Sequence, residues 1–232
     1  MADVLTAAAF VVWVALAVVW GRDLPSLPVS VESGRLSFDL LRLRQVRAAV
    51  LASLTLFLPV GIYDALWDRY ITDRGGNNFQ VGLTFLLYTI PFVVLGAAGG
   101  RLADRRGPGS MTVVGLYLTA PLVLVYGFLS SPELLVGFAI VEGVIGALSI
   151  PAAQSLMASV APKGRAAAAQ GLAGSGDLVA ATLMSLAAPI LYGSFGPEAT
   201  FGVAAGLMMI SGTAVALMLR GAPKDAEATT VS

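Results

Sequence analysis

Long apolar runs separated by short polar stretches make up most of this chain. A helix needs about 20 consecutive apolar residues to cross a bilayer, and a run much shorter than that does not span it. Seven runs meet or approach this length, at approximately residues 4–20, 48–67, 79–99, 111–130, 134–158, 166–192 and 197–219. The pattern therefore predicts an all-α fold, a polytopic membrane helical bundle of about seven transmembrane helices.

Polar segments divide the chain into four predicted regions. These are a transmembrane helix at 1–20, a cytoplasmic linker at 21–47, a six-helix transmembrane bundle at 48–219 and a cytoplasmic tail at 220–232. In the linker, Leu36, Leu40 and Leu43 recur at helical spacing among arginines. This spacing fits an interfacial amphipathic helix, and a solvated basic linker fits it equally well.

The first apolar run must be compared with a secretory signal. A signal needs a basic N-terminus and small residues at its cleavage site. Here the chain begins Met-Ala-Asp, the first positive charge is Arg22, and bulky residues stand where cleavage would occur. We therefore expect a membrane helix with its N-terminus outside.

The basic residues are distributed unevenly between the two sides of the predicted bundle. With the N-terminus outside, twelve of the fourteen Lys and Arg residues face the cytoplasm, and only Arg69 and Arg74 face outward. This is the asymmetry that the positive-inside rule requires. We expect a multi-pass protein of a bacterial plasma membrane with its C-terminus in the cytoplasm.

The composition agrees with a membrane protein and limits its chemistry. Hydrophobic residues make up 57% of the chain, charged residues make up 12%, and fourteen basic residues balance fourteen acidic ones. Because the net charge is zero, nothing favours nucleic acid as a partner. Cysteine and histidine are both absent, which removes thiol nucleophiles, imidazole bases and the usual transition-metal ligands, so we expect no metal and no cofactor.

A polar turn between the third and fourth runs reads Gly100-Arg-Leu-Ala-Asp-Arg-Arg-Gly107. It resembles the G-x-L-A-D-R-x-G loop, motif A, of the major facilitator superfamily. The resemblance implies a conformational-switch loop, in which Gly100 allows close backbone approach and Asp104 caps a neighbouring helix N-terminus. Arg105 and Arg106 would pair with cytoplasmic carboxylates, and Gly107 would permit the turn. The simpler interpretation is a basic hairpin between any two membrane helices.

The order of the segments is similar to the C-terminal half of this family preceded by the last helix of the N-terminal half. Complete members have two six-helix halves. Ala139 stands where the N-terminal half usually has an arginine, and residues 171–178 lack the Gly-Pro pair of antiporters. The resemblance therefore implies a half-length carrier, which would need a separate N-terminal half or a second copy of the chain.

Two carboxyl groups lie inside apolar runs, Glu142 and Asp177. A charge in hydrocarbon is costly, and it survives only if it is buried in the bundle, paired, hydrated or protonated. Both residues are therefore candidates for proton coupling or for a substrate cavity. The alternative is a structural carboxyl that only holds helices together.

A third candidate, Asp64, lies in the segment Tyr63-Asp-Ala-Leu-Trp-Asp-Arg-Tyr70. Asp64 and Asp68 are one helical turn apart on the same face, near Trp67. They would suit an outer vestibule for a cation or an aromatic substrate. An interfacial belt of Trp and Tyr is the more common origin of such a segment.

The sequence therefore favours a membrane transport protein of major-facilitator type that carries a small organic solute. Proton coupling rests on the two carboxyl groups Glu142 and Asp177, and the efflux of drugs or metabolites rests on the resemblance. The alternative is a transport-inactive truncated module that acts as a membrane partner, regulator or remnant. A membrane enzyme is disfavoured because no constellation at membrane depth looks like a nucleophile with its base. The expected partners are the lipid bilayer, a small-molecule solute and protons.

Overall fold

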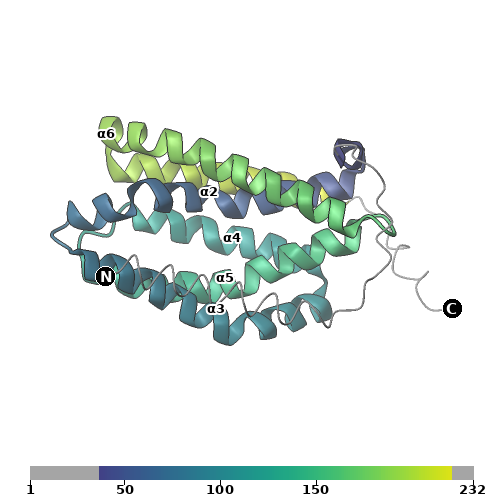
Figure 1. The fold of residues 1–232 in the computed structure, drawn as a ribbon, viewed down its shortest axis with the longest axis horizontal. Coiled ribbons are helices and arrows are strands. Elements are labelled where there is room, and N and C mark those ends of the chain that lie inside the picture. Colours follow the sequence, from purple (N-terminus) through teal and green to yellow (C-terminus); the bar gives the residue numbers. More distant parts are fainter. Residues whose placement is uncertain (1–36, 221–232) are drawn as a thin grey trace, which may run out of the picture. The chain divides into compact units, whose positions relative to one another are not determined.

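The computed structural model describes residues 37–220, so the first predicted membrane helix and most of the C-terminal tail lie outside the described part. Within it the chain is helical throughout (Figure 1). The elements are η1 (Ser37–Arg42), α2 (Arg44–Thr72), α3 (Asn78–Arg106), α4 (Pro108–Tyr126), α5 (Pro132–Val160) and α6 (Ala166–Arg220). Since residues 37–220 contain no strand, the predicted all-α class is confirmed.

Five of the helices between residues 37 and 220 are long and apolar enough to cross a membrane. The last of them, α6, contains a break at Gly196, where φ is 81° and ψ is −179°. Glycine adopts such a positive φ without a steric penalty. Pro197 follows at once, and proline suits the first position of a helix because its missing amide hydrogen is not needed there. The chain reverses direction at this break (Figure 1), so α6 provides two spans.

Helix α2 extends beyond the predicted run at 48–67, because it begins at Arg44 and ends at Thr72. The predicted bounds followed the apolar residues alone. At both ends long charged side chains can reach toward water while the backbone stays helical. The hydrophobic pattern therefore predicted the membrane core of this helix and not its full length.

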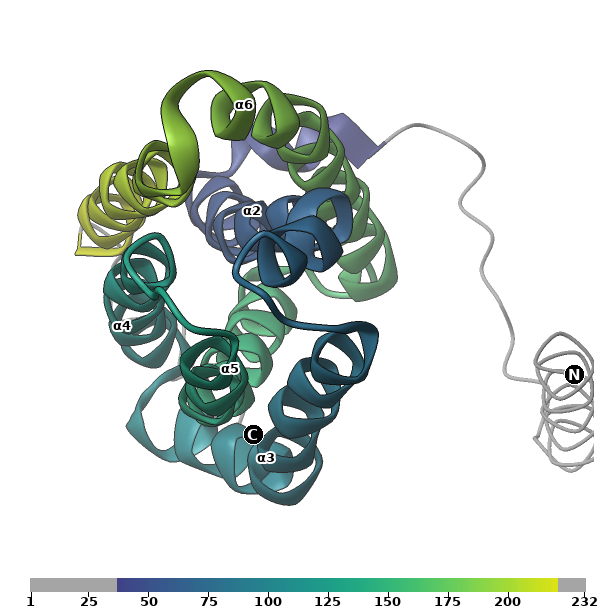
Figure 2. The same cartoon turned by 90° about the vertical axis from the view of Figure 1, so that its left-hand side faces the viewer.

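In the end-on view α2 lies between α6 and α5, and α3 lies on the far side of α5 (Figure 2). The most extensive contacts join α2 to α6 and α3 to α5. Glycine permits both approaches, because a Cβ atom at Gly61 would collide with the carbonyl of Ala181, and one at Gly99 with the carbonyl of Ala147. A Cβ at Gly100 would meet nothing within 4 Å among the described residues. The close backbone contact therefore occurs at Gly99, one residue before the position that the motif suggested.

The segment before α2 is folded against the bundle. Leu40 in η1 is only 1% exposed and packs in a cluster with Val46, Leu156 and Met157. Leu43, in contrast, is 45% exposed. Leu40 and Leu43 therefore do not share one face, because η1 is a short 3₁₀ helix with a tighter repeat than an α-helix. Leu36 lies outside the described residues.

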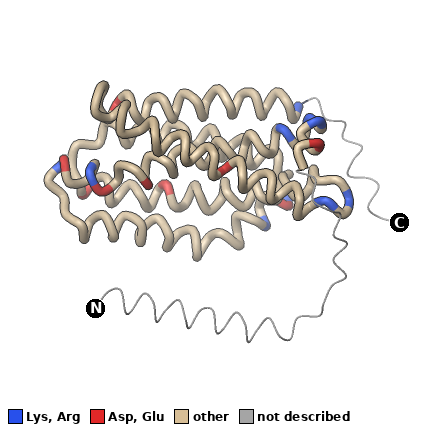
Figure 3. Tube along the Cα trace, turned by 45° about the horizontal axis from the view of Figure 1, so that its top comes forward, with Lys and Arg blue, Asp and Glu red and all other residues tan. Residues whose placement is uncertain are grey.

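Charged residues of the described part gather at the two ends of the helices (Figure 3). Lys and Arg are confined to these ends, whereas a few acidic residues lie along the middle of the bundle. This distribution is typical of a protein that spans a bilayer. Which end faces the cytoplasm stays a prediction.

Candidate functional site

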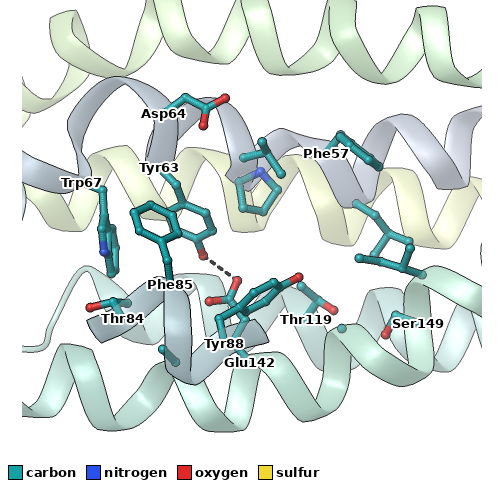
Figure 4. Close-up of a pocket in the computed structure, with 16 residues that line it drawn as sticks. Phe57, Tyr63, Asp64, Trp67, Thr84, Phe85, Tyr88, Thr119, Glu142 and Ser149 are labelled. Carbon is teal, nitrogen blue, oxygen red and sulfur yellow. Dashed lines mark hydrogen bonds between the residues drawn. The ribbon is translucent and has the colours of Figure 1, made fainter. Parts of the chain in front are cut away.

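A cavity of about 230 Å³ lies between α2, α3, α4 and α5 (Figure 4). Aromatic and aliphatic side chains form most of its wall. Its polar lining consists of carboxyl and hydroxyl groups, those of Tyr63, Asp64, Thr84, Tyr88, Thr119, Glu142 and Ser149. None of the described residues that line it is Lys or Arg. The cavity is thus mainly apolar, with acidic groups and no basic ones.

Glu142 is the most buried acidic group of the cavity, with an exposed fraction of 9%. Its Oε1 accepts a hydrogen bond of 2.7 Å from the Tyr63 hydroxyl (Figure 4), and its Oε2 accepts one of 2.8 Å from the Tyr126 hydroxyl. These residues come from α5, α2 and α4 respectively. One carboxyl group therefore connects three helices through neutral donors.

An aromatic cluster surrounds these hydroxyl groups. Tyr63 and Trp67 lie four residues apart on one face of α2, with their ring centroids 5.0 Å apart and edge to face. Tyr126 contacts Trp67 at 5.2 Å and Phe138 at 5.1 Å, again edge to face. Such edge-to-face pairs are favourable beyond the area that they bury. The cluster fixes the positions of the two tyrosines that hold Glu142.

Trp67 is turned into the bundle, with an exposed fraction of 4%, and Tyr63 points toward Glu142. The aromatic residues of this segment therefore do not form a simple interfacial belt. The Trp67 Nε1 group is buried and has no hydrogen-bond partner among the described residues. Trp67 lines the cavity, but this buried nitrogen is not exposed to it.

Two glycines on α5 allow α3 to approach closely beside the cavity. A Cβ at Gly143 would collide with the backbone of Tyr88, and one at Gly146 would lie 2.9 Å from the Tyr88 hydroxyl. Tyr88 itself lines the cavity. The space beside Glu142 is thus occupied by a second aromatic side chain from α3, which could not be predicted from the small residues alone.

The three predicted carboxyl groups do not form one site. Asp64 lines the same cavity as Glu142, although its carboxylate lies apart from Glu142 in Figure 4. Asp177 lies in α6, outside the residues that line the cavity. Its Oδ2 accepts a hydrogen bond of 2.9 Å from the Ser53 hydroxyl on α2, while its Oδ1 is buried without a partner among residues 37–220.

The predicted switch loop lies away from the cavity, at the end of α3. Asp104 accepts a hydrogen bond of 3.0 Å from Ser155 on α5, so in this part of the chain it joins two helices. Its capping of a neighbouring helix N-terminus stays a prediction, as do carboxylate partners for Arg105 and Arg106. Gly107 has a φ of 90°, which the turn into α4 requires.

The cavity residues differ in how visible they are in the sequence. Glu142 and Asp64 stand out as charges near or within apolar runs, whereas Tyr88 and Tyr126 do not, because aromatic residues are ordinary in such runs. The only signal for these tyrosines would have been an aromatic residue with a hydroxyl group on a predicted helix that also carries a charged residue. Among the described residues, no three His, Cys, Asp or Glu side chains come together as metal ligands would.

Comparison with known proteins gives one family. Residues 48–231 match the family model described as the Major Facilitator Superfamily. An uncharacterized MFS-type transporter of Methanocaldococcus jannaschii is 30% identical over 118 residues, which are 50% of this chain and 30% of that protein. A probable actinorhodin transporter of Streptomyces coelicolor is 32% identical over 119 residues, which are 51% of this chain and 21% of that protein. The matched stretch is thus less than one third of either relative.

Proposed function

Because the chain belongs to the major facilitator superfamily, we propose that it forms half of a membrane carrier for a small organic solute. The observation that carries this proposal is the cavity beside Glu142. A concave and mostly apolar space with a few converging polar groups is the usual form of a small-molecule site. The solute would lie against α2, α3 and α5, which provide most of the lining.

A complete pathway would need surfaces that the described helices lack. Helix α3 exposes Val93 at 73% and Val94 at 70%, and α6 exposes Leu183 at 62% and Leu186 at 66%. Lipid can cover such faces, and so can helices of another subunit. We infer that a separate N-terminal half or a second copy of this chain packs here and closes the other side of the cavity.

Proton coupling is the second part of the proposal. Glu142 has hydrogen-bonded oxygens but no basic partner among the described lining residues. A carboxyl group in this position would gain a proton when the cavity faces one side of the membrane and lose it when the cavity faces the other. Asp177, with one unpartnered oxygen, is a further candidate for the same role.

Efflux is the proposed direction of transport. Its support is the name of the Streptomyces relative, a probable actinorhodin transporter, which implies the movement of a small organic product. We extend to this chain only the class of cargo, a drug-like compound or metabolite. The bacterial plasma membrane and an outside N-terminus complete the proposed setting.

Transport can be tested with the full chain in proteoliposomes, alone and together with a candidate N-terminal half. A panel of labelled solutes is added and a pH gradient is imposed. We expect accumulation that depends on the gradient and is lost in Glu142→Gln. The control Asp68→Asn, an exposed carboxylate on α2 outside the cavity lining, should behave like the parent.

The alternative is a transport-inactive module that acts on another membrane protein. It is favoured by the exposed apolar faces of α3 and α6, which would suit a permanent partner as well as a carrier half. Folded protein that moves no solute in any assembly, yet co-purifies with one membrane partner in constant proportion, would support this alternative over the carrier.

A further inference from the structure

The cavity beside Glu142 combines an uncompensated acidic group with aromatic walls. We propose that it binds a small lipophilic organic cation, such as a quaternary or protonated amine, directly against Glu142. This inference rests on the proposed function, because it names the class of solute for the same cavity. It is carried by three features of the described residues, which are the charge, the rings and the size.

The charged groups that line the cavity are all acidic. Tyr63 and Asp64 from α2, Tyr88 from α3 and Tyr126 from α4 are the titratable groups that surround Glu142. None of them is basic, and α6 contributes no residue to the lining. When it is ionised, a buried carboxyl group held only by neutral hydroxyls has hydrogen bonds but no counter-charge. A bound cation would supply that counter-charge.

The walls suit an organic cation better than a metal ion. A cation above an aromatic face is attracted by the ring quadrupole, most strongly above Trp. Tyr63, Trp67 and Tyr88 all line the cavity. An aliphatic part of the wall is formed by Leu56, Val60 and Ile150. Among the described residues no three His, Cys, Asp or Glu side chains come together as a metal ion would need. Apolar substituents on an amine would contact the aliphatic part while the charged nitrogen meets Glu142.

The size of the cavity narrows the class of ligand further. A volume of about 230 Å³ lies below the range of roughly 300–1,000 Å³ that is usual for drug-sized ligands. The cavity therefore fits a small amine or one end of a larger one.

The cation and a proton would compete for the same group. When the cation binds, the protonated Glu142 carboxyl group releases one proton to solvent. The resulting carboxylate then pairs with the cation. The affinity for the cation should therefore fall as the pH falls. This competition would link the solute to the proton movement proposed above.

Calorimetric titration of the full chain in uncharged maltoside micelles tests the inference. The probes are benzyltrimethylammonium, which has no titratable proton, and neopentylbenzene, its uncharged isostere with carbon in place of nitrogen. Empty micelles provide the reference. We expect the cation to bind about tenfold or more tightly than the isostere, with proton release detected from buffers of different ionisation enthalpy.

Variants identify the group responsible. Glu142→Gln should abolish both the preference for the cation and the proton release, whereas Asp68→Asn should keep them. Equal affinity of the parent for the two probes would overturn the inference without any variant, so the test does not depend on the folding of Glu142→Gln. Unchanged cation binding by a folded Glu142→Gln protein would overturn it too.

Failure of this inference and failure of the proposed function give different results. Binding is measured at equilibrium and does not require transport. Cation binding by a chain that transports nothing in any assembly would contradict the carrier alone. Transport of uncharged solutes without any preference for the cation would contradict only the assignment of the solute class.

Discussion

At the scale of single residues, the site is organised by tyrosine hydroxyls. Tyr63 and Tyr126 each donate to a different oxygen of Glu142, so the carboxyl group is satisfied without a basic neighbour. Hydrogen bonds to a charged group contribute about 1.5–3 kcal/mol each. The two tyrosines therefore stabilise the bundle and hold the carboxyl group at the cavity wall.

The contribution of one such bond can be measured with Tyr126→Phe. The ring, which is fully buried, keeps its packing, while Glu142 Oε2 loses its donor. We expect the free energy of unfolding to fall by about 1.5–3 kcal/mol, as measured by denaturant unfolding in micelles. Tyr117→Phe is the matched control, because that hydroxyl contacts only the exposed Thr213. Equal losses in the two variants would show that the Glu142 contact adds nothing special.

Sequence alone identified the acidic members of the site and missed their partners. A carboxyl group inside an apolar run is conspicuous because hydrocarbon excludes it. Which face of α5 carries Glu142, and that Tyr88 and Tyr126 share its surroundings, depends on how the helices rotate against each other. That rotation is fixed by contacts distant in sequence, such as the approach of α3 to Gly143.

At the scale of helices, glycine determines how closely α3 and α5 pack. Two glycines allow this close contact because they lack a Cβ atom, Gly99 on α3 and Gly143 on α5. Small residues at such crossings let backbones approach where lipid provides no hydrophobic drive for association. The α3–α5 pair therefore depends on the absence of two Cβ atoms.

Gly143→Ala tests this dependence. The added methyl group would collide with the Tyr88 backbone, and overpacking of this kind costs about 1–3 kcal/mol. We expect a lower midpoint of thermal unfolding in micelles. Gly137→Ala on the same helix meets nothing within 4 Å, so it should be neutral or raise stability by about 0.5–1 kcal/mol. A Gly143→Ala protein as stable as Gly137→Ala would contradict the packing described here.

The short helix η1 is attached through an ion pair that should depend on pH. Arg165 donates to both carboxylate oxygens of Asp39, at 2.5 and 3.1 Å, and this hydrogen-bonded guanidinium lowers the pKa of Asp39. A depressed pKa in the folded state gives stability above the unfolded value of about 3.9, and that stability is lost as the pH falls through the folded pKa.

Asp39→Asn should therefore weaken the attachment of η1 at neutral pH and make no difference in acid below the folded pKa of Asp39. Protease cleavage between η1 and α2 reports the attachment directly. Faster cleavage of the variant at neutral pH, with equal rates for variant and parent in acid, is the expected pattern. A difference that persists unchanged in acid would assign the effect to something other than the ion pair.

The ends of the helices were predictable where glycine and proline interrupt the apolar runs. Gly196 and Pro197 separate two apolar runs, and the structure breaks at that point. The start of α2 at Arg44 was not predictable from hydropathy, because a charged residue at a membrane surface can be helical or not. The role of Leu40 also depended on a pocket formed by α2, α5 and α6.

At the scale of the whole molecule, the described helices form a bundle with charged residues at both ends (Figure 3) and exposed apolar faces on α3 and α6. The fold class and the family were predictable because seven apolar runs and one loop motif are strong signals. The cavity was not predictable, because its lining comes from four helices that meet only in the folded bundle.

The topology can be tested by single cysteines, since the chain contains none. Ser110 in the first turn of α4 and Thr72 at the end of α2 are both exposed and lie at opposite ends of the bundle. In intact cells, Ser110→Cys should be shielded from an impermeant thiol reagent, and Thr72→Cys should react. Labelling of Ser110→Cys from outside would reverse the orientation and remove the switch loop from the cytoplasm.

The break at Gly196 has a consequence for how this protein is made. Because the chain reverses at one glycine, no hydrophilic loop separates the two parts of α6. No such loop could therefore stay in water while the first part enters the bilayer. The two parts of α6 should therefore leave the translocation machinery together, as a preformed helical hairpin, and a nascent chain arrested just after Gly196 should remain uninserted.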